Sequence, residues 1–77
     1  MTVTVGEWTE QFAHRLGIVA PSEEEQEHLL ELAGVAAHAS ERTAAPISCW
    51  LAARAGIEPS HACSIGRQLA EEIGTGS

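Results

Sequence analysis

The feature that most constrains the fold is a helix start at Ser22. Glu25 follows three residues later, so the two side chains can each satisfy a free amide at the first turn. Glu23 and Glu24 lie in that turn, where the positive end of the helix dipole favours carboxylates. Apolar residues then recur at helical spacing. The pattern predicts a long amphipathic helix from residue 23 to the last turn around residue 42.

Similar start and stop signals predict three further helices. Thr4 and Glu7 form a second capping box, and Gly17 and Gly56 are suited to ending helices because glycine accepts positive φ. Proline suits the first turn of a helix, which places starts at Pro46 and near residues 58–60. No stretch requires a strand. The sequence therefore predicts an all-α fold, a compact bundle of four short helices, formed by one domain of residues 1–77 with a frayed tail at 74–77.

A chain of 77 residues with only three aromatic side chains has little material for a core. Small domains have a thin margin of stability, which leaves a homo-oligomer as an open alternative. We expect all three aromatics to be buried. The predicted central layer is Trp8, Phe12, Leu29, Leu32, Ala36, Ile47, Trp50, Leu51, Ile65 and Leu69.

The charge balance excludes some classes of partner. Eleven acidic residues, all glutamate, stand against four arginines and give a formal charge of −7. A polyanion is repelled by such a chain, so we expect neither nucleic acid nor an anionic membrane as partner. Only two cysteines are present, and neither a signal segment nor a membrane-spanning apolar run is found. The expected location is the reducing cytoplasm.

The candidate site is the joint between the second and third predicted helices. His38 and Glu41 lie three residues apart, so the carboxylate can orient the imidazole, and Arg42 follows directly. If the next helix begins at Pro46, free amides face the same corner and an anion would fit there. The predicted ligand-binding residues are His38, Glu41, Arg42, Ile47, Ser48 and Cys49.

Simpler interpretations of this corner remain open. The pair of His38 and Glu41 is more often a solvated surface contact, and Arg42 is equally typical of a side chain that satisfies helix C-terminal carbonyls. No complete catalytic set and no spacing typical of metal ligands occurs, so we expect no metal site and favour a non-enzymatic role. A small anionic-ligand binder or minimal enzyme that uses His38, Glu41 and Arg42 is the alternative.

The pattern His38-x-x-Glu41-Arg42-x-x-Ala45-Pro46, with Trp8 and Leu16-Gly17 before it, resembles a small bacterial helical family. Members of that family are found beside, or fused to, molybdopterin-guanine dinucleotide biosynthesis proteins. The resemblance covers most of the chain and implies a cytosolic accessory role close to molybdenum-cofactor delivery. It implies a protein partner, no resident cofactor and at most a transient molybdopterin-type ligand.

Overall fold

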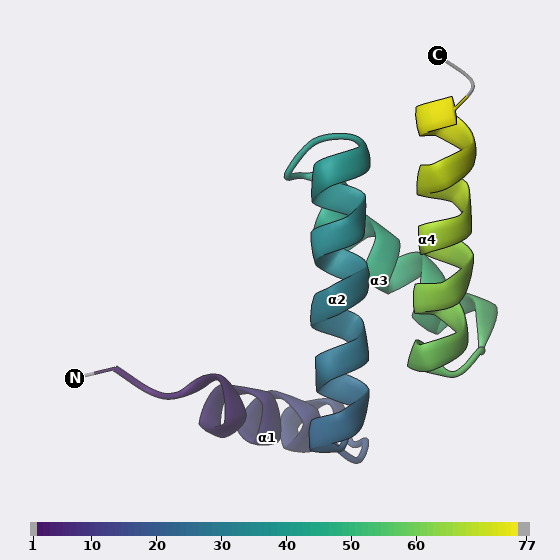
Figure 1. Cartoon of the computed structure of the whole chain (residues 1–77). Coiled ribbons are helices and arrows are strands. Elements are labelled where there is room, and N and C mark those ends of the chain that lie inside the picture. Colours follow the sequence, from purple (N-terminus) through teal and green to yellow (C-terminus); the bar gives the residue numbers. More distant parts are fainter. Residues whose placement is uncertain (1, 76–77) are drawn as a thin grey trace.

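The computed structural model describes residues 2–75, which form four α-helices (Figure 1). In chain order they are α1 (Val5–Leu16), α2 (Glu23–Ala39), α3 (Ala44–Ala55) and α4 (Pro59–Thr75). No strand occurs within this described part of the chain. The prediction of an all-α bundle of four short helices is confirmed.

The predicted capping boxes are present at the starts of α1 and α2. The amide of Glu7 donates to the Thr4 hydroxyl at 3.0 Å, and the Thr4 amide donates to the Glu7 carboxylate at 2.8 Å. Ser22 and Glu25 form the same reciprocal pair. Gly17 ends α1 with φ 74°, a left-handed conformation that glycine adopts without steric cost.

The joint between α2 and α3 differs from the prediction. α2 ends at Ala39 because Ser40 leaves helical geometry, with φ −131° and ψ −106°. α3 begins at Ala44, so the predicted start at Pro46 is wrong. Proline lacks an amide hydrogen, but the third position of a helix needs no intrahelical donor either, so Pro46 is tolerated there.

The last helix extends nearly to the end of the chain. α4 continues through Gly74 and Thr75, and the frayed tail at residues 74–77 stays a prediction. Gly76 and Ser77 lie outside the described residues.

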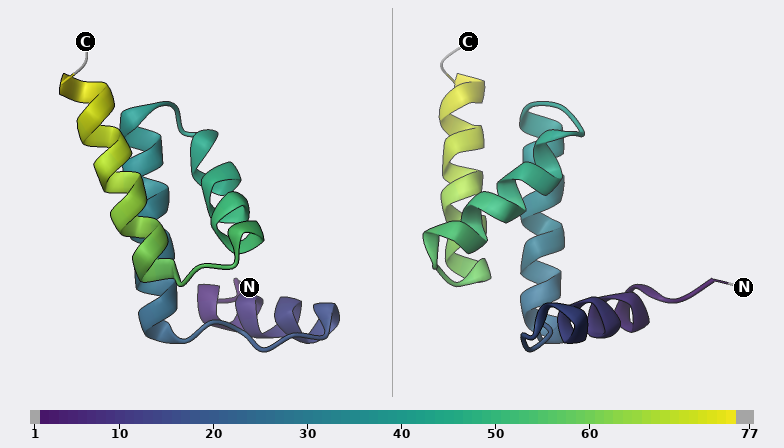
Figure 2. Two further views of the ribbon diagram at one scale, coloured as in Figure 1. Left: turned by 90° about the vertical axis from the view of Figure 1, so that its right-hand side faces the viewer. Right: turned by 180° about the vertical axis from the view of Figure 1, so that it is seen from behind.

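α2 is the central helix, and both α3 and α4 pack against it (Figures 1 and 2). Few apolar residues are buried: Leu32 of α2 forms a cluster with Ala62 and Cys63 of α4, and Ala13 of α1 is buried outside this cluster. Gly66 lies next to Leu32, since a Cβ atom there would come within 2.7 Å of the Leu32 Cδ1 atom. Arg67 of α4 forms an ion pair with Glu31 of α2.

α3 and α4 diverge from each other and make only slight mutual contact. Figure 2 shows α3 crossing α2 and α4 on one side of the pair. α2 is thus covered by two helices that leave a space between them.

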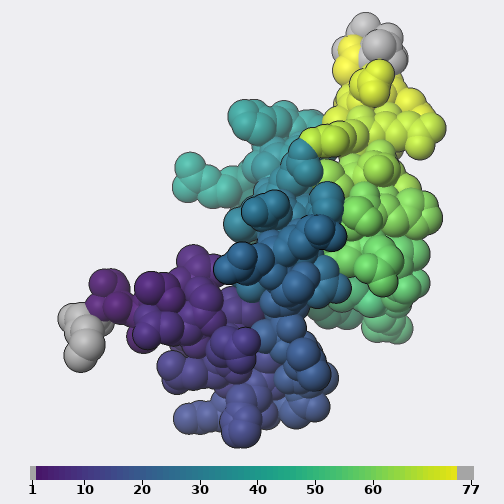
Figure 3. Space-filling model, turned by 60° about the horizontal axis from the view of Figure 1, so that its bottom comes forward, coloured from purple at the N-terminus to yellow at the C-terminus, as the bar shows by residue number. Residues whose placement is uncertain are grey.

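α1 stands apart from the other helices. Among the described residues, its backbone makes no close contact with α2, α3 or α4. It lies across the foot of α2, and in Figure 3 it forms a lobe on the side of α2 away from α4.

The predicted core is therefore wrong in most of its members. Of the ten residues expected there, only Leu32 is buried. Trp8, Phe12 and Trp50 are 61%, 52% and 58% exposed. The physical reason is that the helices cover one another only in part: the backbone of α1 makes no close contact with the other helices, and α3 and α4 diverge, so the large apolar side chains stay exposed.

Candidate functional site

The structure separates the three polar residues of the predicted corner. His38 lies in the last turn of α2, whereas Glu41 and Arg42 lie in the connector beyond the helix end, and all three are exposed. Within residues 2–75, no hydrogen bond or ion pair joins the His38 side chain to Glu41 or Arg42. A continuous helix would have placed the side chains of His38 and Glu41 on one face, but helical geometry is lost at Ser40.

The amide donors expected at the corner are also used elsewhere. Because α3 starts at Ala44, the amides of Ala44 and Ala45 donate to the carbonyls of Glu41 and Arg42, at 2.9 Å and 3.1 Å. The other predicted donors are inside the helix, where each amide bonds one turn back: Ile47, Ser48 and Cys49. The argument for an anion at this helix start is therefore wrong, and ligand binding by the six residues stays a prediction.

The Cys49 side chain packs against the core and does not face a ligand-binding site. Its thiol donates to the Leu29 carbonyl at 3.7 Å, and the side chain contacts the core of Leu32, Ala62 and Cys63. Burial raises the pKa of the Cys49 thiol above its ordinary value of 9.0. A thiol held neutral in this way is a poor nucleophile and a poor metal ligand.

The divergence of α3 and α4 creates an open apolar groove, the α3–α4 groove. It consists of two adjoining cavities of about 140 Å³ and 300 Å³, which share Leu32, Ser48 and Gly66. Ser48 is the one predicted site residue among those three. The larger side chains on the walls are Leu51 of α3 and Ile65, Leu69 and Ile73 of α4.

The walls of the α3–α4 groove offer apolar surface and little chemistry. Leu51, Ile65, Leu69 and Ile73 are 47% to 55% exposed. The polar side chains that line it are the hydroxyls of Ser40 and Ser48. Such a surface can bind another apolar surface, but it holds no group suited to proton transfer or covalent catalysis.

Charges are distributed unevenly around this groove. α3 and α4 together carry two arginines and two glutamates, whereas α2 carries five glutamates and no arginine. His38 lines a neighbouring recess with Arg67 of α4, which shares Val35, Ala39 and Ile73 with the groove. The helices that wall the groove are thus electrically balanced, and the acidic charge is concentrated on α2.

A second apolar surface runs along α1. Trp8, Phe12 and Leu16 recur at four-residue intervals and form what we call the α1 stripe. The Trp8 and Phe12 rings are stacked, with centroids 5.9 Å apart. All three side chains are more than half exposed.

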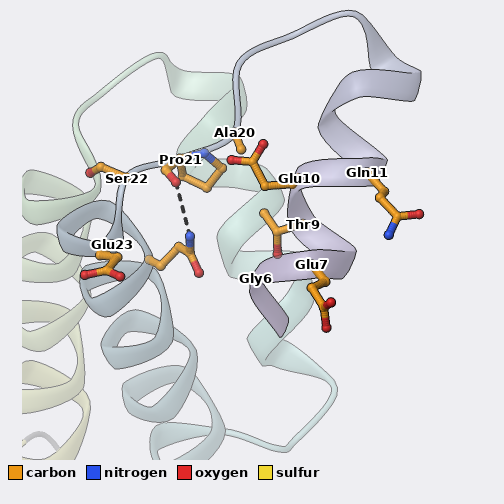
Figure 4. A pocket seen from close by; sticks show the side chains of 10 residues that line it. Gly6, Glu7, Thr9, Glu10, Gln11, Ala20, Pro21, Ser22 and Glu23 are labelled. Atoms are coloured by element: carbon orange, nitrogen blue, oxygen red, sulfur yellow. Dashed lines mark hydrogen bonds between the residues drawn. The ribbon is translucent and has the colours of Figure 1, made fainter. Parts of the chain in front are cut away.

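A wide recess with a volume of about 770 Å³ lies between α1 and the start of α2 (Figure 4). Glu7, Glu10 and Glu23 line it, but Figure 4 shows their carboxylates pointing apart. Glu7 is already engaged in the α1 capping box, and its hydrogen bonds with Thr4 lower the pKa of its carboxyl. No group of three or more potential metal ligands is found among the residues described. This recess therefore offers no convergent binding geometry.

Sequence reasoning missed the α3–α4 groove. The signal is the apolar stripe Ile65, Leu69 and Ile73, of which Ile65 and Leu69 were predicted to lie in the core. Periodicity identifies an apolar face without saying whether another helix covers it.

Comparison with known proteins identifies a family but no function. None of the helices in the described part of the chain combines the length and apolarity needed to span a bilayer. No curated protein and no solved structure shows significant similarity to the chain. A family model, described as a domain of unknown function, matches residues 2–74. The chain therefore belongs to the DUF6457 family of domains.

Proposed function

We propose that the protein is a non-enzymatic interaction module whose α3–α4 groove binds an amphipathic helix of a partner protein. The observation that carries this proposal is the set of large apolar side chains, about half exposed, along both walls of an open groove: Leu51, Ile65, Leu69 and Ile73. Recognition of a helix in a groove uses apolar anchors at three- and four-residue spacing.

The exposed apolar area is sufficient for useful affinity. Burying a whole leucine or isoleucine side chain contributes about 1.5–3 kcal/mol, so covering the exposed half of four such residues contributes roughly 3–6 kcal/mol. The anchors of the incoming helix add a similar amount, and association costs at least about 4 kcal/mol. The balance is at most about 2–8 kcal/mol, which corresponds to a dissociation constant between roughly micromolar and tens of millimolar. We therefore propose that the protein acts as an adaptor that binds its partner reversibly rather than in a permanent complex.

The partner we propose is a protein of molybdenum-cofactor maturation, and the support for it is the sequence resemblance around His38 and Arg42. The alternative, a small anionic ligand such as a molybdopterin held by His38, Glu41 and Arg42, loses the amide donors that motivated it. The groove-binding proposal rests on a surface that the described residues form without rearrangement.

A neutral helical peptide tests the groove directly. The probe is a fluorescein-labelled synthetic amphipathic helix of leucine, alanine and glutamine, uncharged so that the acidic chain does not attract it. We expect fluorescence anisotropy to show saturable binding to the wild type. Leu69→Glu places a charge on the groove wall and should weaken binding at least tenfold.

The matched control is Gln68→Glu, which adds the same charge one position away at an exposed residue that is not part of the groove walls. It should bind as the wild type does. Circular dichroism should show that both variants keep their helices, because Leu69 and Gln68 are exposed. Equal binding by the two variants, or no binding by the wild type, would refute the proposed function.

A further inference from the structure

We infer that the resident occupant of the groove is a second copy of this chain: α1 of each copy packs into the α3–α4 groove of the other. The product is a twofold-symmetric dimer that exchanges its N-terminal helices. This inference rests on the proposed function, because it uses the same groove, and it adds that partner helices must displace α1.

The first argument is that α1 cannot easily stand alone. It has 12 residues and no backbone contact with another helix. Isolated helices shorter than about 12–15 residues are marginal in water, and most helix stability in proteins comes from packing an apolar face. The α1 stripe is such a face. Both ends of α1 are nevertheless fully capped, by Thr4 and by Gly17. A capped helix whose apolar face is this exposed needs a second surface to cover that face.

The second argument is that its own chain holds α1 away from the groove. Gly17 ends α1 in a left-handed turn, and the Ile18 amide closes that turn on the Ala13 carbonyl at 3.0 Å. The side-chain amide of Gln26 donates to the Pro21 carbonyl at 3.1 Å, directly before the Ser22 capping box. These bonds fix the connector from both sides. The direction they impose leads α1 across the foot of α2, as Figure 2 shows, so a second molecule must supply its cover.

The third argument is the amount of surface. The chain exposes 6205 Å², whereas a typical folded monomer of 8.1 kDa exposes about 4,500 Å². The excess is about 1,700 Å² per chain, or about 3,400 Å² for two chains. Stable homodimers bury roughly 2,000–5,000 Å² in total. Exchange of α1 would cover the α1 stripe and the α3–α4 groove, and so remove part of this excess from solvent.

The fourth argument is that charge does not oppose this dimer at the contact. α1 carries two glutamates and one arginine, and α3 and α4 carry two of each. The five glutamates of α2 are not grouped on either contacting surface, so the formal charge of −7 per chain is not concentrated at the interface. A reciprocal contact of α1 with a groove also closes on itself after two copies and leaves no open end for a filament.

Sedimentation equilibrium of the full chain tests the inference. The wild type should have about twice the chain mass of 8.1 kDa, with the dimer fraction increasing with concentration. Phe12→Glu charges the α1 stripe and should give a monomer. Its control, Gln11→Glu, charges the neighbouring exposed position off the stripe and should remain dimeric. Leu69→Glu should also give a monomer because the groove is lost.

Mixing the two monomeric variants separates the exchanged arrangement from other dimers. Phe12→Glu retains an intact groove and Leu69→Glu an intact α1, so a mixture of the two restores one of the two contacts. We expect mixed dimers, weaker than the wild type. A dimer that joins α1 to α1, or groove to groove, cannot be restored in this way. A monomeric wild type, or mixed variants that do not associate, would overturn the inference.

Peptide binding tests the proposed function independently of the dimer. Phe12→Glu leaves the groove free, so it should bind the neutral peptide at least as tightly as the wild type, and Leu69→Glu should not bind it. If the wild type is monomeric but peptide binding still depends on Leu69, only the dimer fails. If Phe12→Glu does not bind the peptide, the groove itself is not a helix-binding site.

Discussion

Leu32→Ala is expected to destabilise the fold far more than Leu30→Ala, although both remove the same atoms from α2 two residues apart. Leu32 is 5% exposed and belongs to the core, whereas Leu30 is 68% exposed. Removing a buried leucine side chain costs about 2–5 kcal/mol, including the cavity that remains. Leu30 loses only the buried third of its contact, about 0.5 kcal/mol, and alanine recovers part of this through its better helix propensity.

These magnitudes are large on the scale of the whole molecule. A chain of this length is stabilised by roughly 4–12 kcal/mol, so Leu32→Ala removes about a sixth or more of the total. With a urea m-value of about 1 kcal/mol/M, its unfolding midpoint should fall by about 2 M or more, against about 0.5 M for Leu30→Ala. The assay is urea titration of the helical circular-dichroism signal at one chain concentration. Equal midpoint shifts for the two variants would refute the assignment of the core to Leu32.

Three further outcomes are expected. Gly34→Ala should raise the melting temperature by about 4–8 °C, because nothing lies within 4 Å of the new methyl group and alanine is about 1 kcal/mol better in a helix. Gly66→Ala should gain less or lose stability, since its Cβ would lie 2.7 Å from a leucine methyl of α2; a larger gain at Gly66 than at Gly34 contradicts this. Hydrogen bonds with Thr4 hold the pKa of Glu7 below its ordinary 4.5, so the ionised carboxylate stabilises α1 above that pH and its contribution disappears as the pH falls through the lowered value. Circular dichroism should show this loss of helix, and Glu7→Gln, which keeps the capping bond without titrating, should reduce it. Burial raises the pKa of Cys49 above 9.0, so labelling by iodoacetamide at about pH 8, followed by peptide mass mapping, should be at least tenfold slower than for a free cysteine; labelling at the free-cysteine rate would show that the thiol is accessible.

Local signals predicted the elements of this fold well. Thr4, Ser22, Gly17 and Gly56 mark helix ends through their own hydrogen bonds or their own φ angles, so the information lies within a few residues. Pro46 was misleading because proline fits any position of the first turn, and its presence does not fix which one.

The packing could not be predicted in the same way. Trp8, Phe12 and Trp50 have the spacing and size of core residues, but their burial depends on where distant helices lie, and no short-range pattern records the divergence of α3 from α4. Likewise, nothing in the local sequence distinguishes Gly34, which has open space beside it, from Gly66, where a neighbouring helix approaches closely.

The candidate site shows the same division between local and long-range information. The ligand-binding hypothesis for His38 depended on the helix continuing to Glu41, and one residue outside helical geometry, Ser40, removes it. Ser48 was selected as an amide donor and instead lines the α3–α4 groove through its side chain.

Gly66 gives the groove a property that its walls do not determine. It lies where the two cavities meet, and in place of a side chain it presents only hydrogen atoms. A methyl group there would push the end of Leu32 toward the open space and make the groove shallower at its midpoint. In the proposed complex, this one residue on α4 therefore limits the size of the side chain that a partner helix can insert. A single substitution there would restrict binding to helices with small anchor residues.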